Sequence, residues 1–358
     1  MKRWRWIALL LCALLTVSVF AACETKPQAE SSTVSVDGPV GMTKQLLDHL
    51  GERDLEEFEL VILSTTEEYA FGDIQFATDE LNSDPVNDAI FERNNLIEDL
   101  YNCKITVQFC GEGEPFLERV TTDCLSGTVN YQVVASGISS TGIPKLALDG
   151  LIQDLYAIED SHLQLDGDWW DQNAIDDLSI GNKLFFASGD IAVTDDEMTT
   201  MLVFNKELIE ENQLEDPYQL VRDDKWTMDK MYEMCKAVAK DGGDGVMNIA
   251  GEEDTWGLIG AAFDCYRLIL GGNAPMVSKD ENDLPVISVT NAYNVDVFLD
   301  VYEIMTDKSR VAWWEQYYRW DDYENGRKLT DQFYAGRVLF MVSDVCSMND
   351  ERMLNSQI

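Results

Sequence analysis

The alternation of strand-like and helix-like segments after residue 57 constrains the fold of this 358-residue chain more than any other feature. Residues 58–63 form a short apolar run of the kind that fills a buried strand. Residues 104–109 alternate polar and apolar side chains, as a strand with one buried face does, and residues 131–134 resemble a third strand. Because strands separated by helices pair in parallel through right-handed crossovers, the pattern predicts an α/β unit.

Two predicted helices connect these strands. The first begins at Pro85, with Asp84 as its N-cap, and ends at Asn102. The second begins at Pro115 and is closed by Gly127. Helical spacing directs two sets of side chains toward the core: Val86, Ala89, Ile90, Ile97, Leu100 and Tyr101 from the first helix, and Phe116, Val120 and Cys124 from the second.

The alternation continues after residue 181 and predicts a second α/β unit. An acidic loop over 190–197 is expected between its first two strands. The other expected elements are strands over 182–187, 201–205, 256–258 and 338–342, helices after Thr227 and over 261–270 and 291–305, and a β-hairpin over 276–287.

The N-terminal residues predict export. A basic start is followed by an apolar run over 7–22, which is the layout of a secretory signal peptide. Two small residues precede Cys23, and this resembles the lipobox of bacterial lipoproteins, although Phe20 departs from its usual leucine. The resemblance implies that residues 1–22 are removed and that Cys23 carries a lipid. An uncleaved anchor helix or an ordinary signal peptide is the alternative.

Charge and composition narrow the possible partners. Residues 23–57 begin with an almost apolar-free stretch and predict a flexible tether. The chain has 26 basic and 66 acidic residues, a formal net charge of −40, so nucleic acids and anionic membrane surfaces are poor partners. Besides Cys12 and Cys23 there are six scattered cysteines without a C-x-x-C pair. The sequence leaves open whether these six cysteines form disulfides or remain free thiols.

Motifs of common enzyme classes are absent from the sequence. There is no G-x-S-x-G, H-E-x-x-H or P-loop, and two histidines leave few parts for a triad or a metal site. The acidic runs 176–177 and 252–254 invite a glycosidase interpretation, but adjacent carboxylates lack the separation that this chemistry needs. The acidic residues over 280–283 could bind calcium, but they lack the ligand spacing of an EF-hand. No cofactor or metal is predicted.

Short motifs in a specific order resemble the extracellular solute-binding proteins of ABC importers, family 1. The resemblance covers about residues 58–341, with each motif weak on its own. It rests on the lipobox-like Cys23, residues 87–94 (NDAIFERN), 152–155 (IQDL), 181–184 (GNKL), 204–208 (FNKEL), 225–229 (KWTMD), 256–258 (WGL), 271–272 (GG) and 333–341 (FYAGRVLFM).

The resemblance implies a periplasmic-binding-protein-like, type II fold of two α/β lobes. Lobe one is expected over 58–190, incomplete, and lobe two over 191–358, with a hinge near 190–196. Chains of this family cross back to lobe one after the Phe-x-x-Gly segment, whereas this sequence ends there. We therefore expect a truncated fragment that lacks the second crossover.

The same resemblance implies a function without catalysis. The protein would sit on the extracellular face of the membrane, held by lipid at Cys23, capture a small solute such as a sugar between the lobes, and deliver it to an ABC-type permease. Two alternatives stay open: a secreted carbohydrate-active enzyme, and a lipoprotein that senses a ligand without transporting it.

Candidate ligand-binding residues also follow from the resemblance. They are Ser136, Ser139, Trp169, Trp170, Asp195, Asp196, Phe263, Tyr266 and Asp344. Ser136 and Asp344 are favoured independently, because open α/β sheets bind ligands at the carboxyl ends of their strands. A capping or solvated role is an equal alternative for each polar residue. Core packing is the alternative for Trp169 and Trp170 and for a second aromatic cluster over 313–320.

Overall fold

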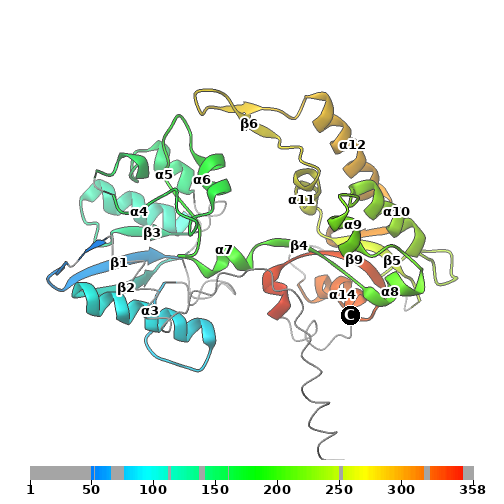
Figure 1. The fold of residues 1–358 in the computed structure, drawn as a ribbon, viewed down its shortest axis with the longest axis horizontal. Coiled ribbons are helices and arrows are strands. Elements are labelled where there is room, and N and C mark those ends of the chain that lie inside the picture. The colour runs from blue at the N-terminus through cyan, green and yellow to red at the C-terminus, as the bar shows by residue number, and fades with distance from the viewer. Residues whose placement is uncertain are drawn as a thin grey trace, which may run out of the picture. The chain divides into compact units, whose positions relative to one another are not determined.

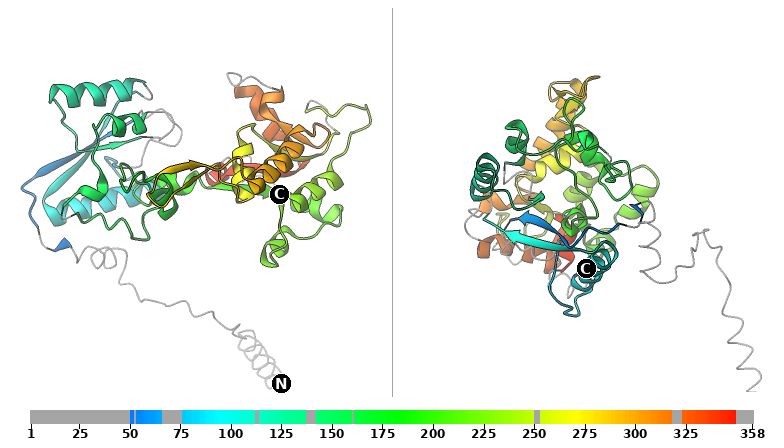
Figure 2. Two further views of the ribbon diagram at one scale, coloured as in Figure 1. Left: turned by 90° about the horizontal axis from the view of Figure 1, so that it is seen from above. Right: turned by 90° about the vertical axis from the view of Figure 1, so that its left-hand side faces the viewer.

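The computed structural model describes residues 50–51, 53–65, 76–111, 114–136, 142–159, 161–249, 253–317 and 323–349 of the protein. The elements shown in Figures 1 and 2 belong to a compact unit, Asp54–Ile358. The predicted signal peptide and Cys23 lie outside the described residues.

The first sheet confirms the predicted parallel α/β unit. Its strands are β1 (Phe58–Ser64), β2 (Cys103–Phe109) and β3 (Val133–Ala135), arranged in the order β2-β1-β3. Both β2 and β3 pair with β1 in parallel. The apolar run at the start of the unit therefore became the central strand, and residues 61–64 of it are buried.

Helices α3 (Pro85–Tyr101) and α4 (Glu114–Ser126) lie on opposite faces of this sheet (Figure 1). The strand order requires this arrangement, because two right-handed crossovers that step in opposite directions from β1 and β2 place their helices on opposite sides. The core on the α4 side also receives α5 (Ile143–Leu148). It consists of Val61, Leu63, Phe116, Val120, Tyr131, Ile143 and Leu146.

Helix α3 has the predicted ends but not the predicted buried face. The Asp84 carboxylate accepts hydrogen bonds from two backbone N–H groups of the first turn, and Asn102 ends the helix in a left-handed conformation. The predicted stripe is partly wrong, because Val86, Ala89 and Leu100 are exposed.

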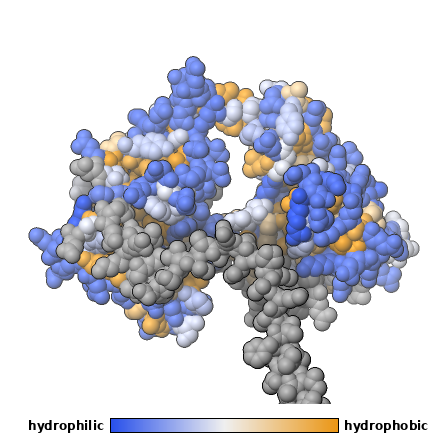
Figure 3. All heavy atoms as spheres, in the orientation of Figure 1, coloured by the Kyte–Doolittle hydropathy of each residue, from blue (hydrophilic) through white to orange (hydrophobic). Residues whose placement is uncertain are grey.

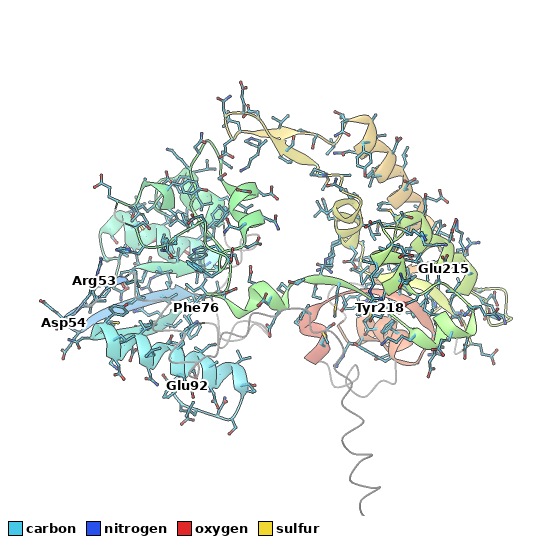
Figure 4. All side chains as sticks on the ribbon, in the orientation of Figure 1. Arg53, Asp54, Phe76, Glu92, Glu215 and Tyr218 are labelled. Carbon is cyan, nitrogen blue, oxygen red and sulfur yellow. The ribbon has the colours of Figure 1, made fainter. Side chains whose placement is uncertain are left out.

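Two asparagines occupy the buried face of α3 instead, together with Ile90. The Asn94 amide donates to the carbonyl of Phe76 at 2.7 Å, and the Asn87 amide donates to the carbonyl of Glu80 at 2.8 Å. Figure 4 labels Phe76 beside the helix. These polar side chains are buried because they satisfy the backbone of the segment that precedes the helix.

Two predictions for the segment that follows are wrong. After the 3-10 turn η2 (Leu155–Ala157) and α6 (Gln172–Leu178), residues 182–187 belong to no strand, and Asn182 has a left-handed φ of 61°. Leu184 is buried, and its backbone binds residues 154–155 by single hydrogen bonds rather than by a ladder. The expected acidic loop over 190–197 contains the short helix α7 (Val193–Glu197), on which the predicted hinge falls. Its role as a hinge stays a prediction.

The second sheet has the order β4-β9-β5-β8. Its strands are β4 (Thr200–Phe204), β5 (Trp256–Gly260), β8 (Val311–Trp313) and β9 (Val338–Asp344). Strands β5, β8 and β9 run parallel to one another, and β4 runs antiparallel to β9. The other elements are α8 (Lys206–Glu211), α9 (Pro217–Arg222), α10 (Met228–Val238), α11 (Asp264–Gly271), β6 (Val277–Lys279), β7 (Pro285–Ile287), α12 (Ala292–Thr306), α13 (Trp314–Tyr317), α14 (Tyr323–Tyr334) and η3 (Val345–Asn349).

The predicted helix after Thr227 is confirmed as α10, and its Met231, Cys235 and Val238 are buried in the core against β5 and β9. The predicted hairpin is β6–β7, and α11 and α12 match the remaining expected helices. For the second aromatic cluster, Trp313 takes the core-packing alternative, since it is 2% exposed and its indole N–H donates to the carbonyl of Met305.

Hydrophilic residues cover most of the surface in view in Figure 3. No helix within the described ranges is long and apolar enough to span a membrane. The six described cysteines are free thiols. Of the two alternatives, disulfides or free thiols, the structure therefore has the free thiols. They are Cys103, Cys110, Cys124, Cys235, Cys265 and Cys346.

Asp307, at the end of α12, predicts a pH-dependent loss of stability. Burial alone would raise the pKa of its carboxyl, but hydrogen bonds from Ser309, Tyr232 and Arg310 outweigh burial and lower the pKa to about 2. A carboxylate with a depressed pKa stabilises the fold above its ordinary pKa of 3.8 and loses that contribution as the pH falls toward 2. We expect Asp307→Asn to cost about 2 kcal/mol of unfolding free energy at pH 7.

Urea denaturation of wild type and Asp307→Asn at pH 7, 4 and 3 measures this effect. The difference between the two proteins should be largest at pH 7 and shrink below pH 4. A difference that stays constant with pH would show that the substitution removes packing rather than a charged interaction.

Candidate functional site

The carboxyl edge of the second sheet gathers the strongest candidate site. Parallel β5, β8 and β9 all end at this edge. The antiparallel β4 begins there, since Thr200 pairs with Asp344. Ligands of α/β proteins bind where parallel strands end, because the connecting loops there are free to carry polar groups.

An arginine joins two carboxylates at this edge. The Arg267 guanidinium donates to Asp264 Oδ1 at 2.9 Å and to both carboxylate oxygens of Asp344 at 2.7 and 3.0 Å. The Thr200 hydroxyl also donates to Asp344, at 3.1 Å. Nη1 of the planar guanidinium binds Asp264 and Nη2 binds Asp344, so the fixed plane sets where the two carboxylates lie relative to each other. Asp344 is therefore held in one orientation while its side chain stays 19% exposed.

Asp264 binds Arg267 from a buried position. Its side chain is 3% exposed, and its second oxygen accepts the Ala261 N–H at 2.7 Å. Burial raises the pKa of the Asp264 carboxyl, while the Ala261 N–H and Arg267 oppose the rise. The last residue of β5 must be glycine for this packing. A Cβ on Gly260 would lie 2.5 Å from Asp264 Oδ2 and 2.9 Å from the Trp313 ring.

A third carboxylate lies at the end of β8. Glu315 accepts the N–H of Ala262 at 2.7 Å, which joins the loops after β5 and β8. Among the residues that the structure describes, the edge thus carries Asp264, Glu315 and Asp344 against Arg267. This excess of negative charge opposes the binding of anionic solutes.

Two aromatic side chains accompany the carboxylates. Phe263 precedes α11 and is 46% exposed, and Tyr266 in the first turn of α11 is 54% exposed. The guanidinium carbon of Arg267 lies 5.3 Å from the centre of the Phe263 ring. Exposed rings beside oriented carboxylates can stack on an apolar ligand face while the oxygens accept hydrogen bonds from hydroxyl groups.

Three of the residues predicted from sequence therefore occur together: Phe263, Tyr266 and Asp344. Two others, Asp195 and Asp196, lie on α7. Asp195 accepts the Ser188 hydroxyl at 2.6 Å, and Asp196 is exposed. Ligand binding by these residues stays a prediction.

The pair Trp169 and Trp170 lies on the chain that leads to α7. Trp170 forms an antiparallel bridge with Gly189, and its indole N–H donates to the carbonyl of Leu163 at 2.8 Å. Trp169 is 39% exposed. Trp170 is thus tied to backbone, whereas Trp169 keeps a surface that a ligand could contact.

The two predicted serines have different outcomes. Ser136 directly follows β3, at the carboxyl edge of the first sheet. Its hydroxyl oxygen is buried and forms no hydrogen bond with any other residue that the structure describes. Ser139 lies outside the described residues.

Sequence reasoning missed Arg267, Asp264 and Glu315. A signal existed for the first, because Arg267 is the only basic residue between Lys240 and Lys279 in a strongly acidic chain. No comparable signal marked Asp264 or Glu315. Their importance depends on which strands are neighbours in the sheet, and the sequence order of the strands does not reveal this.

Solved structures of two bacterial proteins are similar to this chain. A maltose-bound extracellular solute-binding protein from Staphylococcus aureus has 15% identity and a TM-score of 0.50, with 83% of this chain and 64% of that chain covered. A maltose-bound periplasmic protein from Listeria monocytogenes has 16% identity and a TM-score of 0.48, with 84% and 63% covered. The Staphylococcus similarity supports a two-lobed solute-binding fold, as expected from the sequence.

The present chain spans less than two thirds of the length of each of these two proteins. A comparison with curated protein sequences gives no significant match. The family description of bacterial extracellular solute-binding proteins matches residues 87–343, well over half of the sequence. The chain therefore belongs to the bacterial extracellular solute-binding protein family.

Proposed function

We propose that this protein captures an uncharged carbohydrate between its two lobes and delivers it to an ABC-type permease. The observation that carries the proposal is the Asp344 carboxylate held by Arg267 at the carboxyl edge of the second sheet, with the exposed Phe263 ring against the same guanidinium. Family membership supports the role in solute binding.

The chemistry of the edge favours a sugar over other small solutes. Arg267 is saturated by two carboxylates, so it is a poor partner for a phosphate or carboxylate ligand. Asp344 has one oxygen that accepts from both Thr200 and Arg267 and a second that accepts from Arg267 at 3.0 Å. A carboxylate oxygen has room for a further donor, such as a sugar hydroxyl. Phe263 and Tyr266 supply apolar faces.

The predicted lipid at Cys23 would hold the protein at the extracellular face of the membrane. In this proposal the residues after Cys23 act as a tether that lets the folded body reach the permease. The strong negative charge supports this placement, because it keeps the body away from anionic lipid headgroups.

A thermal-shift screen tests the proposal directly. We expect maltose or a related oligosaccharide to raise the melting temperature by about 5–10 °C at about one hundred times its Kd, because a ligand that binds only the native state stabilises it. Sugar phosphates and dicarboxylates at the same concentration should give no shift.

Turnover of the sugar is measured in parallel by chromatography. Stabilisation without consumption of the sugar supports capture for transport. Stabilisation by amino acids or peptides alone, or rapid product formation, would contradict the proposal and favour another solute or an enzyme.

A further inference from the structure

The β6–β7 hairpin is inserted between α11 and α12, and its base is fixed to α12. The Asn294 side-chain amide is buried and donates to the carbonyls of Pro275 at 2.6 Å and Ser288 at 3.0 Å. These two carbonyls lie on opposite sides of the hairpin base. Asn294 therefore holds both ends of the hairpin against the start of α12.

The hairpin turn is equally well determined. Asp280 accepts the N–H groups of Asn282 at 2.8 Å and Leu284 at 2.9 Å. Asp283 adopts a left-handed conformation with φ of 60°. The Lys279 ammonium group lies 2.7 Å from the Asp283 carboxylate, across the turn. Asp280 therefore closes the turn through its side chain, as aspartate commonly does in turns.

The same turn contacts residues that follow α6. The Asp283 carboxylate accepts the Ser179 hydroxyl at 3.0 Å and the Asn182 N–H at 2.8 Å. Its backbone carbonyl accepts the Gly181 N–H at 2.9 Å. Lys279 donates to the Ser179 hydroxyl at 2.7 Å and to the backbone carbonyl of Asp176.

These partners lie in the segment that packs against the lobe of the first sheet. The Leu184 backbone binds residues 154–155, and Phe186 packs against the core around β1 and α4. The hairpin, by contrast, is part of the chain that builds the second sheet. The contact therefore joins two parts of the protein whose covalent connection runs through α7.

We propose that the β6–β7 hairpin is a noncovalent strap between the two lobes, and that it limits lobe separation and so slows the release of bound solute. Its effect on release rests on the proposed function, whereas the strap itself is independent of any ligand. Asp283 is the central residue, because it accepts hydrogen bonds from Ser179, Gly181 and Asn182.

Charge makes the contact strong for its size. A carboxylate that accepts N–H and O–H groups beside an ammonium group forms bonds about twice as strong as neutral ones. Lys279 and Asp283 are both largely covered, with side-chain exposures of 22% and 19%. The contacts of the strap therefore depend on one another. Loss of Asp283 removes the acceptor for the lobe-one groups and also the ionic partner of Lys279.

Amide hydrogen exchange tests the strap without any ligand. Asp283→Gly removes the carboxylate and tolerates the positive φ at this position. We expect exchange at Asn182 to accelerate about tenfold or more, because its acceptor is gone. Glu281→Gln removes a negative charge from the exposed tip of the same turn and should leave this exchange unchanged. Unchanged exchange in Asp283→Gly would overturn the proposal.

Stopped-flow dissociation of the sugar identified by thermal shift tests whether the strap slows solute release. We expect Asp283→Gly and Lys279→Met to increase the release rate about tenfold, with Glu281→Gln equal to wild type. Faster exchange with an unchanged release rate would overturn the regulatory role. A wild-type protein that binds no sugar at all would refute the proposed function but leave the exchange result standing.

Discussion

Replacement of Arg267 by alanine is expected to weaken sugar binding about a hundredfold or more, a change in binding free energy of about 2.7 kcal/mol. Two effects add in this variant. Asp344 loses the group that orients its carboxylate, and Asp264, which is 3% exposed, loses its ionic partner. Isothermal titration with the sugar found by thermal shift measures the Kd.

Two further variants separate binding from folding. Arg267→Lys keeps the charge but lacks the planar group whose two terminal nitrogens bridge Asp264 and Asp344, so binding should stay at least about tenfold weaker than in wild type. Arg222→Ala removes an exposed arginine from α9 and should bind normally. A loss of melting temperature in Arg267→Ala with an unchanged Kd would show that Arg267 only supports the fold.

Gly257→Ala is expected to destabilise the protein by about 3 kcal/mol or more, which corresponds to a fall in melting temperature of about 5–10 °C. Gly257 is the second residue of β5, where α10 packs against the strand. A Cβ there would lie 2.5 Å from Cys235 Cβ, 2.7 Å from Cys235 Cα and 2.9 Å from the Cys235 carbonyl oxygen. Two of these atoms belong to the helix backbone, so the helix and the sheet must separate to admit one methyl group.

Gly271→Ala is the matched control for this prediction. Gly271 ends α11, has ordinary backbone angles, and has no atom within 4 Å of an added Cβ. Alanine there should be neutral or stabilise by about 0.5–1 kcal/mol. Urea denaturation of both variants gives the comparison. Equal stability of Gly257→Ala and wild type would mean that α10 and β5 are not packed as closely as the structure shows.

Elements with a strong local signal were predictable. Asp84 before Pro85 and the left-handed Asn102 set the ends of α3, because capping depends on residues that are neighbours in sequence. The hairpin β6–β7 and the strand β1 also had local signals, a turn-forming segment and a short apolar run. Residues 182–187 misled because an apolar run predicts an extended buried segment, whereas a strand also needs a neighbour with free backbone groups.

The candidate site was likewise predictable only in part from the sequence. The sequence predicted Asp344 as a binding candidate because it follows a strand, and the family resemblance added Phe263 and Tyr266. Only the tertiary structure decided that Arg267 joins Asp264 to Asp344, and that Asp283 bonds residues 179–182 a hundred positions earlier. Local propensities act over a few residues, whereas the order of strands in a sheet, and with it every contact across that sheet, results from how the whole chain buries its apolar surface.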